Sequence, residues 1–271
     1  MNRPSALATR FIALGVAVAA IAGAAPPSAQ WLARALVVLG LPLVVGGLGS
    51  RLLSPQRRAG YRAAVALPAL RHLPLLACLG ALDFAALAAG VGLGWARFEP
   101  GAGLASTVWI AALVLALPFA GFVSVVGWEW GLRARLYAVW AERGDGFAAG
   151  SASVVAGVAL SLVHVLPGLA VADPAFVAAG LVALAAREAT ALRLYRRAGV
   201  LLSGTYRMLA IGFDGLLVAD RLAWGSAAFE TVATDPRFYA LRAAGPVVAA
   251  LAAWILAARL DRREGGGRQR F

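Results

Sequence analysis

Two ionisable residues in strongly apolar surroundings are the first candidates for chemistry in this chain. Glu129 lies seventeen residues before Gly146, and His164 lies eighteen residues after it. If the polar, glycine-rich stretch 142–146 is a turn between antiparallel helices, their depths differ by only about 1.5 Å. A carboxylate beside an imidazole can activate water by taking up its proton. Because ionisable groups are costly in lipid, two at one depth predict a functional site.

Other ionisable residues are predicted close to this level. Arg133 follows Glu129 by one helical turn, so the two can pair. Asp214 lies about sixteen residues beyond the next inner turn, near the depth of His164. Arg207 lies two turns before Asp214 and can instead neutralise it. Two structural alternatives stay open: an ion pair of Glu129 and Arg133 at a helix end, and a histidine that only helps to pack helices.

The surroundings are predicted to be a membrane. Hydrophobic residues make up 61% of the 271 residues and charged residues 14%, and mean hydropathy is +0.79. A soluble domain carries about 25% charged residues. Apolar runs near the length that crosses a bilayer recur along the chain. They predict an all-α, polytopic bundle of about eight transmembrane helices in a single domain, 1–271, with a disordered cytoplasmic tail at 261–271.

The predicted spans are Phe11–Ala25, Trp31–Gly49, Leu73–Trp95, Val108–Gly127, Phe147–Pro167, Ala175–Leu192, Val200–Ala219 and Ala243–Ala258. The first is short, and Ala22-Gly23-Ala24 resembles a signal-peptidase site, so an uncleaved helix and a cleaved leader are both open. Polar loops are expected at Arg51–His72 and Asp220–Arg242.

Arginine placement predicts the orientation. All 25 basic residues are arginine, and an eight-span arrangement with an inner N-terminus puts eighteen in inner segments and five in outer ones. The positive-inside rule favours this orientation, with both termini cytoplasmic in a bacterial-type inner or cell membrane.

Composition also argues against other classes of protein. The net charge of +12 comes from arginines in short loops beside apolar helices, which predicts contact with the lipid bilayer and not with nucleic acid. With only two histidines and one cysteine, no three-ligand zinc site and no cofactor is predicted.

The candidate residues carry a family resemblance. Trp128 to Arg133 matches the second Glu and the Arg of an EExxxR motif, and Leu160 to His164 supplies the His of FxxxH. A third motif, HxxxN or HxxxD, would fall on Ala210 to Asp214. Asp214 keeps the acid of that motif, and Ala210 stands in place of its His. These motifs resemble the CPBP family of intramembrane endopeptidases, which includes type II CAAX prenyl endopeptidases and bacteriocin-immunity proteins. The resemblance covers roughly Val108 to Ala219.

This resemblance implies an intramembrane glutamic-type endopeptidase acting on a membrane-embedded or lipidated protein. Glu129 and His164 would activate water, Arg133 would hold Glu129, and Asp214 would polarise His164 or support the oxyanion. In the family the first Glu activates water and a third-motif His stabilises the oxyanion. Trp128 and Ala210 occupy those positions here, so either Glu129 replaces the lost base or the protein binds without cutting.

A proton-coupled transporter is the remaining alternative. Asp83, His164 and Asp214 lie within or beside predicted spans, and chains of such residues form proton relays in transporters. No inverted repeat of the kind typical of transporters is evident in the sequence.

The arginine distribution gives a testable topology. Reporter fusions at Asp173 and Arg237 are expected to lie outside the cell, whereas fusions at Arg57, Asp145 and after Phe271 are expected inside. The measurement is paired activity of reporters that function on one side only. An external reporter at Asp145 would contradict the eight-span arrangement and the depth comparison built on it.

Overall fold

The computed structural model of the protein describes residues 73–100, 146–161, 174–217 and 229–263, together with Ala13, Ala17, Glu129, Arg133 and Ala134. Most of this part is helical, in agreement with the predicted all-α class. Three helices in it are long and apolar enough to cross a membrane by length and composition, over Pro74–Gly92, Pro174–Arg197 and Arg237–Leu256. The full set of eight predicted spans extends beyond the described residues.

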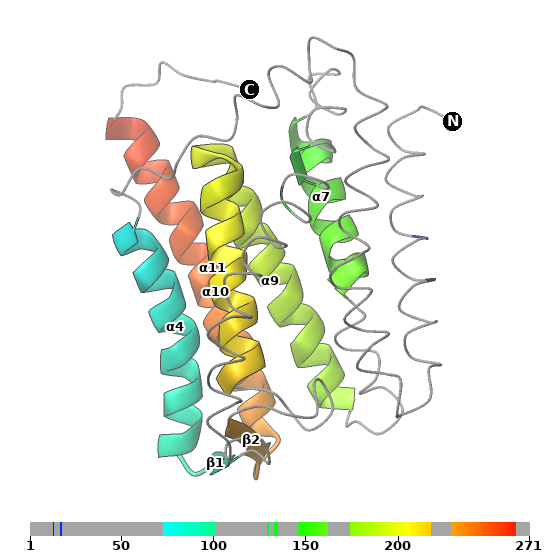
Figure 1. Ribbon diagram of the computed structural model, residues 1–271, viewed down its shortest axis with the longest axis vertical. Coiled ribbons are helices and arrows are strands. Elements are labelled where there is room, and N and C mark those ends of the chain that lie inside the picture. Colours follow the sequence, from blue (N-terminus) through cyan, green and yellow to red (C-terminus); the bar gives the residue numbers. More distant parts are fainter. Residues whose placement is uncertain are drawn as a thin grey trace, which may run out of the picture.

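Five helices stand side by side (Figure 1). They are α4 (Leu73–Gly92), α7 (Gly146–Ser161), α9 (Pro174–Ala198), α10 (Val200–Leu217) and α11 (Arg237–Arg263). The starts of α4, α7, α9 and α10 agree with the predicted spans to within one residue. Length and hydropathy therefore located these four helices correctly.

The start of α11 corrects the sequence prediction. The span was expected from residue 243 after a polar loop, but the helix begins at Arg237. Asp235 supplies the reason, because its Oδ1 accepts a hydrogen bond from the Arg237 backbone N–H at 2.8 Å. Pro236 lies immediately before the helix, where a missing N–H costs nothing. At its other end α11 continues to Arg263, so the first three residues of the predicted disordered tail are helical.

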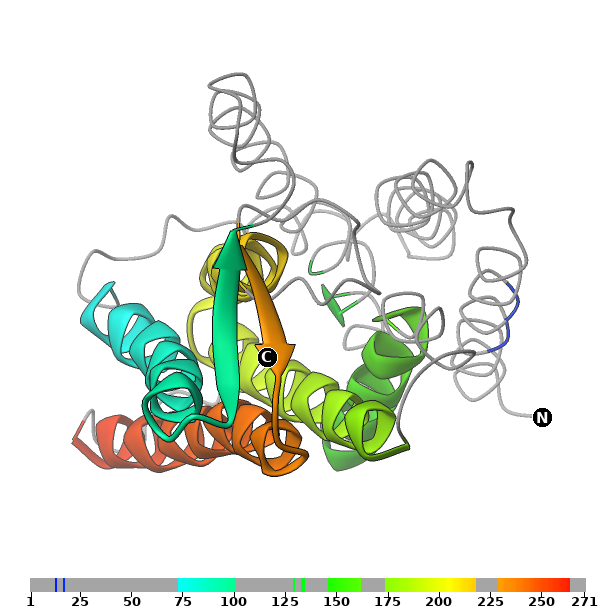
Figure 2. The same cartoon turned by 90° about the horizontal axis from the view of Figure 1, so that it is seen from below.

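A small antiparallel sheet, which the sequence analysis did not predict, crosses one end of the bundle (Figure 2). Strand β1 (Ala96–Pro100) pairs with β2 (Phe229–Ala233), with Ala96 opposite Ala233. The chain turns from α4 into β1 through Gly94, whose φ of 70° favours glycine. The Trp95 carbonyl then accepts the backbone N–H groups of Thr234 and Asp235 at 2.9 and 3.1 Å. The sheet thereby joins the end of α4 to the start of α11.

The guanidinium of Arg237 lies over the Trp95 ring, 4.8 Å from its centroid, at this same end. It also donates to both carboxylate oxygens of Asp235. These hydrogen bonds lower the pKa of the half-buried Asp235 carboxyl below its usual value. The ion pair stays formed at neutral pH as a result.

Helices α9 and α11 run in the same direction. Phe176 and Tyr239, near their starts, make an edge-to-face contact with ring centroids 5.4 Å apart. Near their ends, the Arg193 guanidinium lies over the Trp254 ring at 4.9 Å. Beside this second contact a buried core joins four helices, formed by Leu76, Leu79, Ala191, Leu194, Leu202, Tyr206, Ala249 and Ala253. The alanines let the helix backbones approach closely, as in many membrane helix interfaces.

A tight turn links α9 to α10. Gly199 has a φ of 84°, and its N–H donates to the Tyr195 carbonyl at 2.8 Å. A left-handed glycine of this kind ends helices because other residues pay a steric penalty there. The turn makes α9 and α10 antiparallel neighbours, which brings their middle residues together.

The packing of α4 on α11 gives a matched pair of glycine substitutions. A Cβ on Gly90 would lie 2.5 Å from Phe238 Cδ2, whereas a Cβ on Gly92 would have nothing within 4 Å. Phe238 is buried, so Gly90→Ala should destabilise the protein by about 1–3 kcal/mol. Gly92→Ala should be neutral or stabilising by about 0.5–1 kcal/mol. Thermal unfolding in detergent measures both, and equal midpoints for the two variants would contradict this helix contact.

Candidate functional site

The predicted pairing of Glu129 with Arg133 is confirmed. Arg133 Nε donates to Glu129 Oε2 at 2.7 Å, and Arg133 Nη2 donates to Oε1 at 3.3 Å. This two-point contact uses the planar fork of the guanidinium, which matches a carboxylate well. The backbone at both residues is π-helical. Exposed fractions of 0% for Glu129 and 1% for Arg133 place the pair inside the protein, which excludes the alternative of an exposed pair at a helix end.

Arg133 also reaches two other helices. Its Nη1 donates to Ser153 Oγ of α7 at 3.0 Å and to the backbone carbonyl of Glu188 in α9 at 3.4 Å. Its Nη2 donates to Glu188 Oε2 at 2.7 Å. One buried guanidinium therefore joins three parts of the chain.

Arg207 of α10 completes the group. Its Nε donates to Glu129 Oε1 at 2.6 Å, and its Nη2 donates to Glu188 Oε1. Each of the two carboxylates thus contacts both guanidiniums. We call Glu129, Arg133, Glu188 and Arg207 the charge cluster. Its four formal charges sum to zero.

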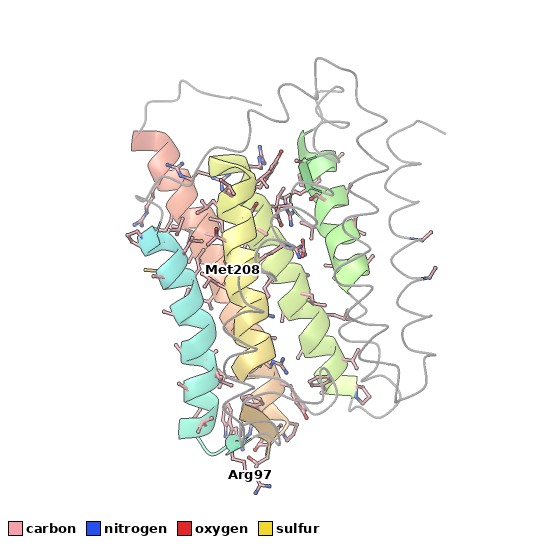
Figure 3. All side chains as sticks on the ribbon, in the orientation of Figure 1. Arg97 and Met208 are labelled. Carbon is pink, nitrogen blue, oxygen red and sulfur yellow. The ribbon has the colours of Figure 1, made fainter. Side chains whose placement is uncertain are left out.

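The turn between α9 and α10 brings two members of the cluster to a similar depth. Glu188 lies eleven residues before Gly199 and Arg207 eight residues after it, so the α9–α10 turn places them opposite each other. Ser153 lies seven residues after the start of α7. At 1.5 Å per residue these residues lie about 10 to 17 Å from the helix ends nearest to them. Figure 3 labels Met208, the neighbour of Arg207, midway along α10.

Because the four side chains of the charge cluster are buried inside the bundle, their charges must balance. Glu188 is 3% exposed and Arg207 7% exposed. Transferring a single charge from water into such surroundings costs several kcal/mol even after the protein relaxes. Two carboxylates and two guanidiniums in mutual contact offset most of that cost. The cluster is consequently stable only as a complete set.

Gly157 of α7 leaves space for one carboxylate. A Cβ at Gly157 would lie 2.6 Å from Glu188 Cδ and would also overlap Glu188 Oε2. The Glu188 side chain therefore occupies the space that a larger residue at position 157 would need. A glycine in the middle of a helix here serves close packing against a charged group.

The predicted site residues have different outcomes. Glu129 and Arg133 lie together as expected. The backbones of Asp83 and Asp214 lie in α4 and α10, but their side chains are outside the described residues, and so is the whole of His164. The predicted pairing of Glu129 with His164 accordingly remains a prediction.

Three contributors to the site were missed. Arg207 was considered only as a possible partner of Asp214, whose side chain lies outside the described residues, and it contacts the two glutamates of the cluster. Glu188 and Ser153 had no predicted role. The sequence could have predicted the contact of Glu188 with Arg207, because they lie eleven residues before and eight residues after the Gly199 turn. Ser153 carried no comparable signal, since a lone serine in an apolar helix is ordinary.

The contacts restrict what Glu129 can do chemically. Its Oε1 accepts from both arginines and its Oε2 accepts from Arg133. A general base must reach a water proton, whereas this carboxylate is fully buried and held by charged donors. Within the described residues, no group of three His, Cys, Asp or Glu side chains is placed to hold a metal ion.

No match to this chain was found among protein-family models, curated proteins or solved structures.

The Gly157 contact yields a direct test of the cluster. Gly157→Ala should push the Glu188 carboxylate away from one or both arginines and lower stability by about 2–4 kcal/mol. The matched control is Gly150→Ala, two turns earlier in α7, where the added Cβ would lie 3.2 Å from Leu192 Cδ2 and not near a charge. Thermal unfolding of both variants is the measurement. A Gly157→Ala variant no less stable than Gly150→Ala would contradict the position of Glu188.

Proposed function

We propose that the protein is a non-catalytic, CPBP-like integral membrane protein that binds a membrane-embedded or lipidated protein segment without hydrolysing it. The observation that carries the non-catalytic part is the engagement of Glu129 by both Arg133 and Arg207. The binding part rests on the family resemblance of the motif-bearing segment.

A glutamic endopeptidase needs a carboxylate that can take up a proton, and Glu129 is poorly suited to that role. In the mechanism of such an enzyme this carboxylate takes a proton from water and later returns it to the leaving amine. Protonating Glu129 would remove one negative charge from a buried neutral set and leave the two guanidiniums with a single carboxylate. The cost of that imbalance opposes proton uptake at this residue. Glu129 is therefore suited to holding helices together.

Ala210 supplies a second argument. The family resemblance places a histidine at this position, where it would support the oxyanion. Ala210 is buried in α10, one helical turn beyond Arg207. A methyl group there can neither donate a hydrogen bond nor carry charge, so this position adds nothing to stabilise developing negative charge.

An intramembrane endopeptidase remains the second candidate, because the spacing of Glu129 and Arg133 reproduces part of the first family motif. It would require the base to come from outside the charge cluster, with His164 as the first residue to test. A proton-coupled transporter through Asp83, His164 and Asp214 is the third, and no contact among the described side chains favours it.

A double-mutant cycle separates a structural Glu129 from a catalytic one. Glu129→Gln should leave an excess positive charge in the cluster and lower stability by about 3–5 kcal/mol. Adding Arg207→Gln restores neutrality, so the double variant should recover part of that loss. The measurement is the unfolding midpoint of wild type, both single variants and the double variant in one detergent.

A catalytic Glu129 predicts a different pattern. The Glu129→Gln variant would then match wild-type stability while losing turnover, and Arg207→Gln would not improve it. His164→Ala removes the other candidate base and changes none of the four charged residues of the cluster. Normal stability of Glu129→Gln, combined with loss of cleavage of a membrane-embedded peptide that the wild type cuts, would overturn the proposal.

A further inference from the structure

An apolar stripe that ends in arginine runs along the exposed side of α11. Val248, Leu251 and Ile255 are 48%, 59% and 54% exposed, and Arg259 is exposed as well. These four residues follow one another at helical spacing, so they lie on one face of the helix. Figure 2 shows α11 at the edge of the described helices, beside α4 and α9.

The length of this stripe matches half a bilayer. Val248 and Arg259 are eleven residues apart, which is about 16 Å along the helix axis. Half of the hydrocarbon thickness of a bilayer is about 15 Å. The stripe can thus follow an acyl chain from the middle of the bilayer to the headgroup level, where Arg259 would lie.

Basic side chains gather beside the polar end of the stripe. Arg193 of α9 lies over the ring of Trp254, which is 43% exposed. Arg196 and Arg197 form the basic last turn of α9, and no acidic residue occurs between Glu188 and the end of that helix. Asp261 is the one acidic residue in the last turn of α11. Positive charge therefore predominates in the last turns of both helices.

We propose that this face of α9 and α11 is a binding site for an anionic phospholipid. The acyl chain lies along Val248, Leu251 and Ile255, and the headgroup phosphate meets Arg193 and Arg259. Tryptophan beside arginine at the level of the headgroups suits such a ligand, since the ring is apolar and its edge is polar. Charge complementarity selects an anionic headgroup over a zwitterionic one. The site is independent of whether the protein cleaves or only binds its protein partner.

The test uses the full-length protein reconstituted in nanodiscs of phosphatidylcholine with a minor share of phosphatidylglycerol. Native mass spectrometry of the released protein gives the ratio of retained phosphatidylglycerol to phosphatidylcholine. The double variant Arg193→Gln/Arg259→Gln should lower this ratio by on the order of fivefold per arginine removed. Arg193→Lys/Arg259→Lys keeps the charge and should retain most of the preference.

Arg237→Gln provides the matched control. Arg237 also stacks on a tryptophan, Trp95, but at the opposite end of the same helix. Its removal should leave the lipid ratio unchanged. A ratio in the double glutamine variant equal to wild type, or an equal loss in Arg237→Gln, would overturn the proposed site. Stabilisation by inorganic phosphate as large as that by phosphatidylglycerol would also overturn it, because the ligand would then be a free anion.

A second measurement covers the case in which the double variant does not fold. Wild-type protein is irradiated with phosphatidylglycerol that carries a photoreactive group in its acyl chain, and the labelled peptide is mapped. Labelling concentrated within residues 248–259 is the expected result. Labelling spread evenly over the other exposed apolar helices would refute a defined lipid site.

Discussion

The requirement that buried charge be neutralised governs the arrangement of this protein. Four ionised side chains lie in an interior formed by apolar helices, and each is at most 7% exposed. Such groups are tolerated only when every charge meets its opposite and the geometry satisfies their hydrogen bonds. Here the two guanidiniums and two carboxylates come from three separate parts of the chain. The positions of those parts are coupled because none can leave without stranding charge.

The same contacts set a limit on chemistry. A carboxylate that two arginines stabilise in its ionised form is a poor proton acceptor, because taking up the proton breaks the balance that permits burial. Glu129 can therefore contribute strongly to the fold or act as a base, and the observed distances favour the former.

The sequence predicted the positions of helices well and the contacts between them poorly. The starts of α4, α7, α9 and α10, the Gly199 turn and the pairing of Glu129 with Arg133 followed from length, glycine placement and one-turn spacing. In a mostly apolar helix, however, composition does not show which face points inward, so the contacts of Arg207 with Glu129 and Glu188 were not predicted. Partners on other helices, such as Glu188, depend on helix rotation. The β1–β2 pairing was missed because two five-residue strands separated by over a hundred residues leave little periodicity.

Two kinds of interaction hold the described helices together. Helices α4 and α11 join α9 and α10 through apolar packing around Leu79, Leu194 and Ala249. Helix α7 and the segment with Glu129 join α9 at Arg133 through hydrogen bonds and an ion pair, and Arg207 of α10 pairs with Glu129. Apolar contacts give little driving force within lipid beyond close packing, whereas the charge cluster fixes specific partners. Helices α9 and α10 belong to both groups, and α7 contacts α9 both at Arg133 and through Val154, which packs against Leu192.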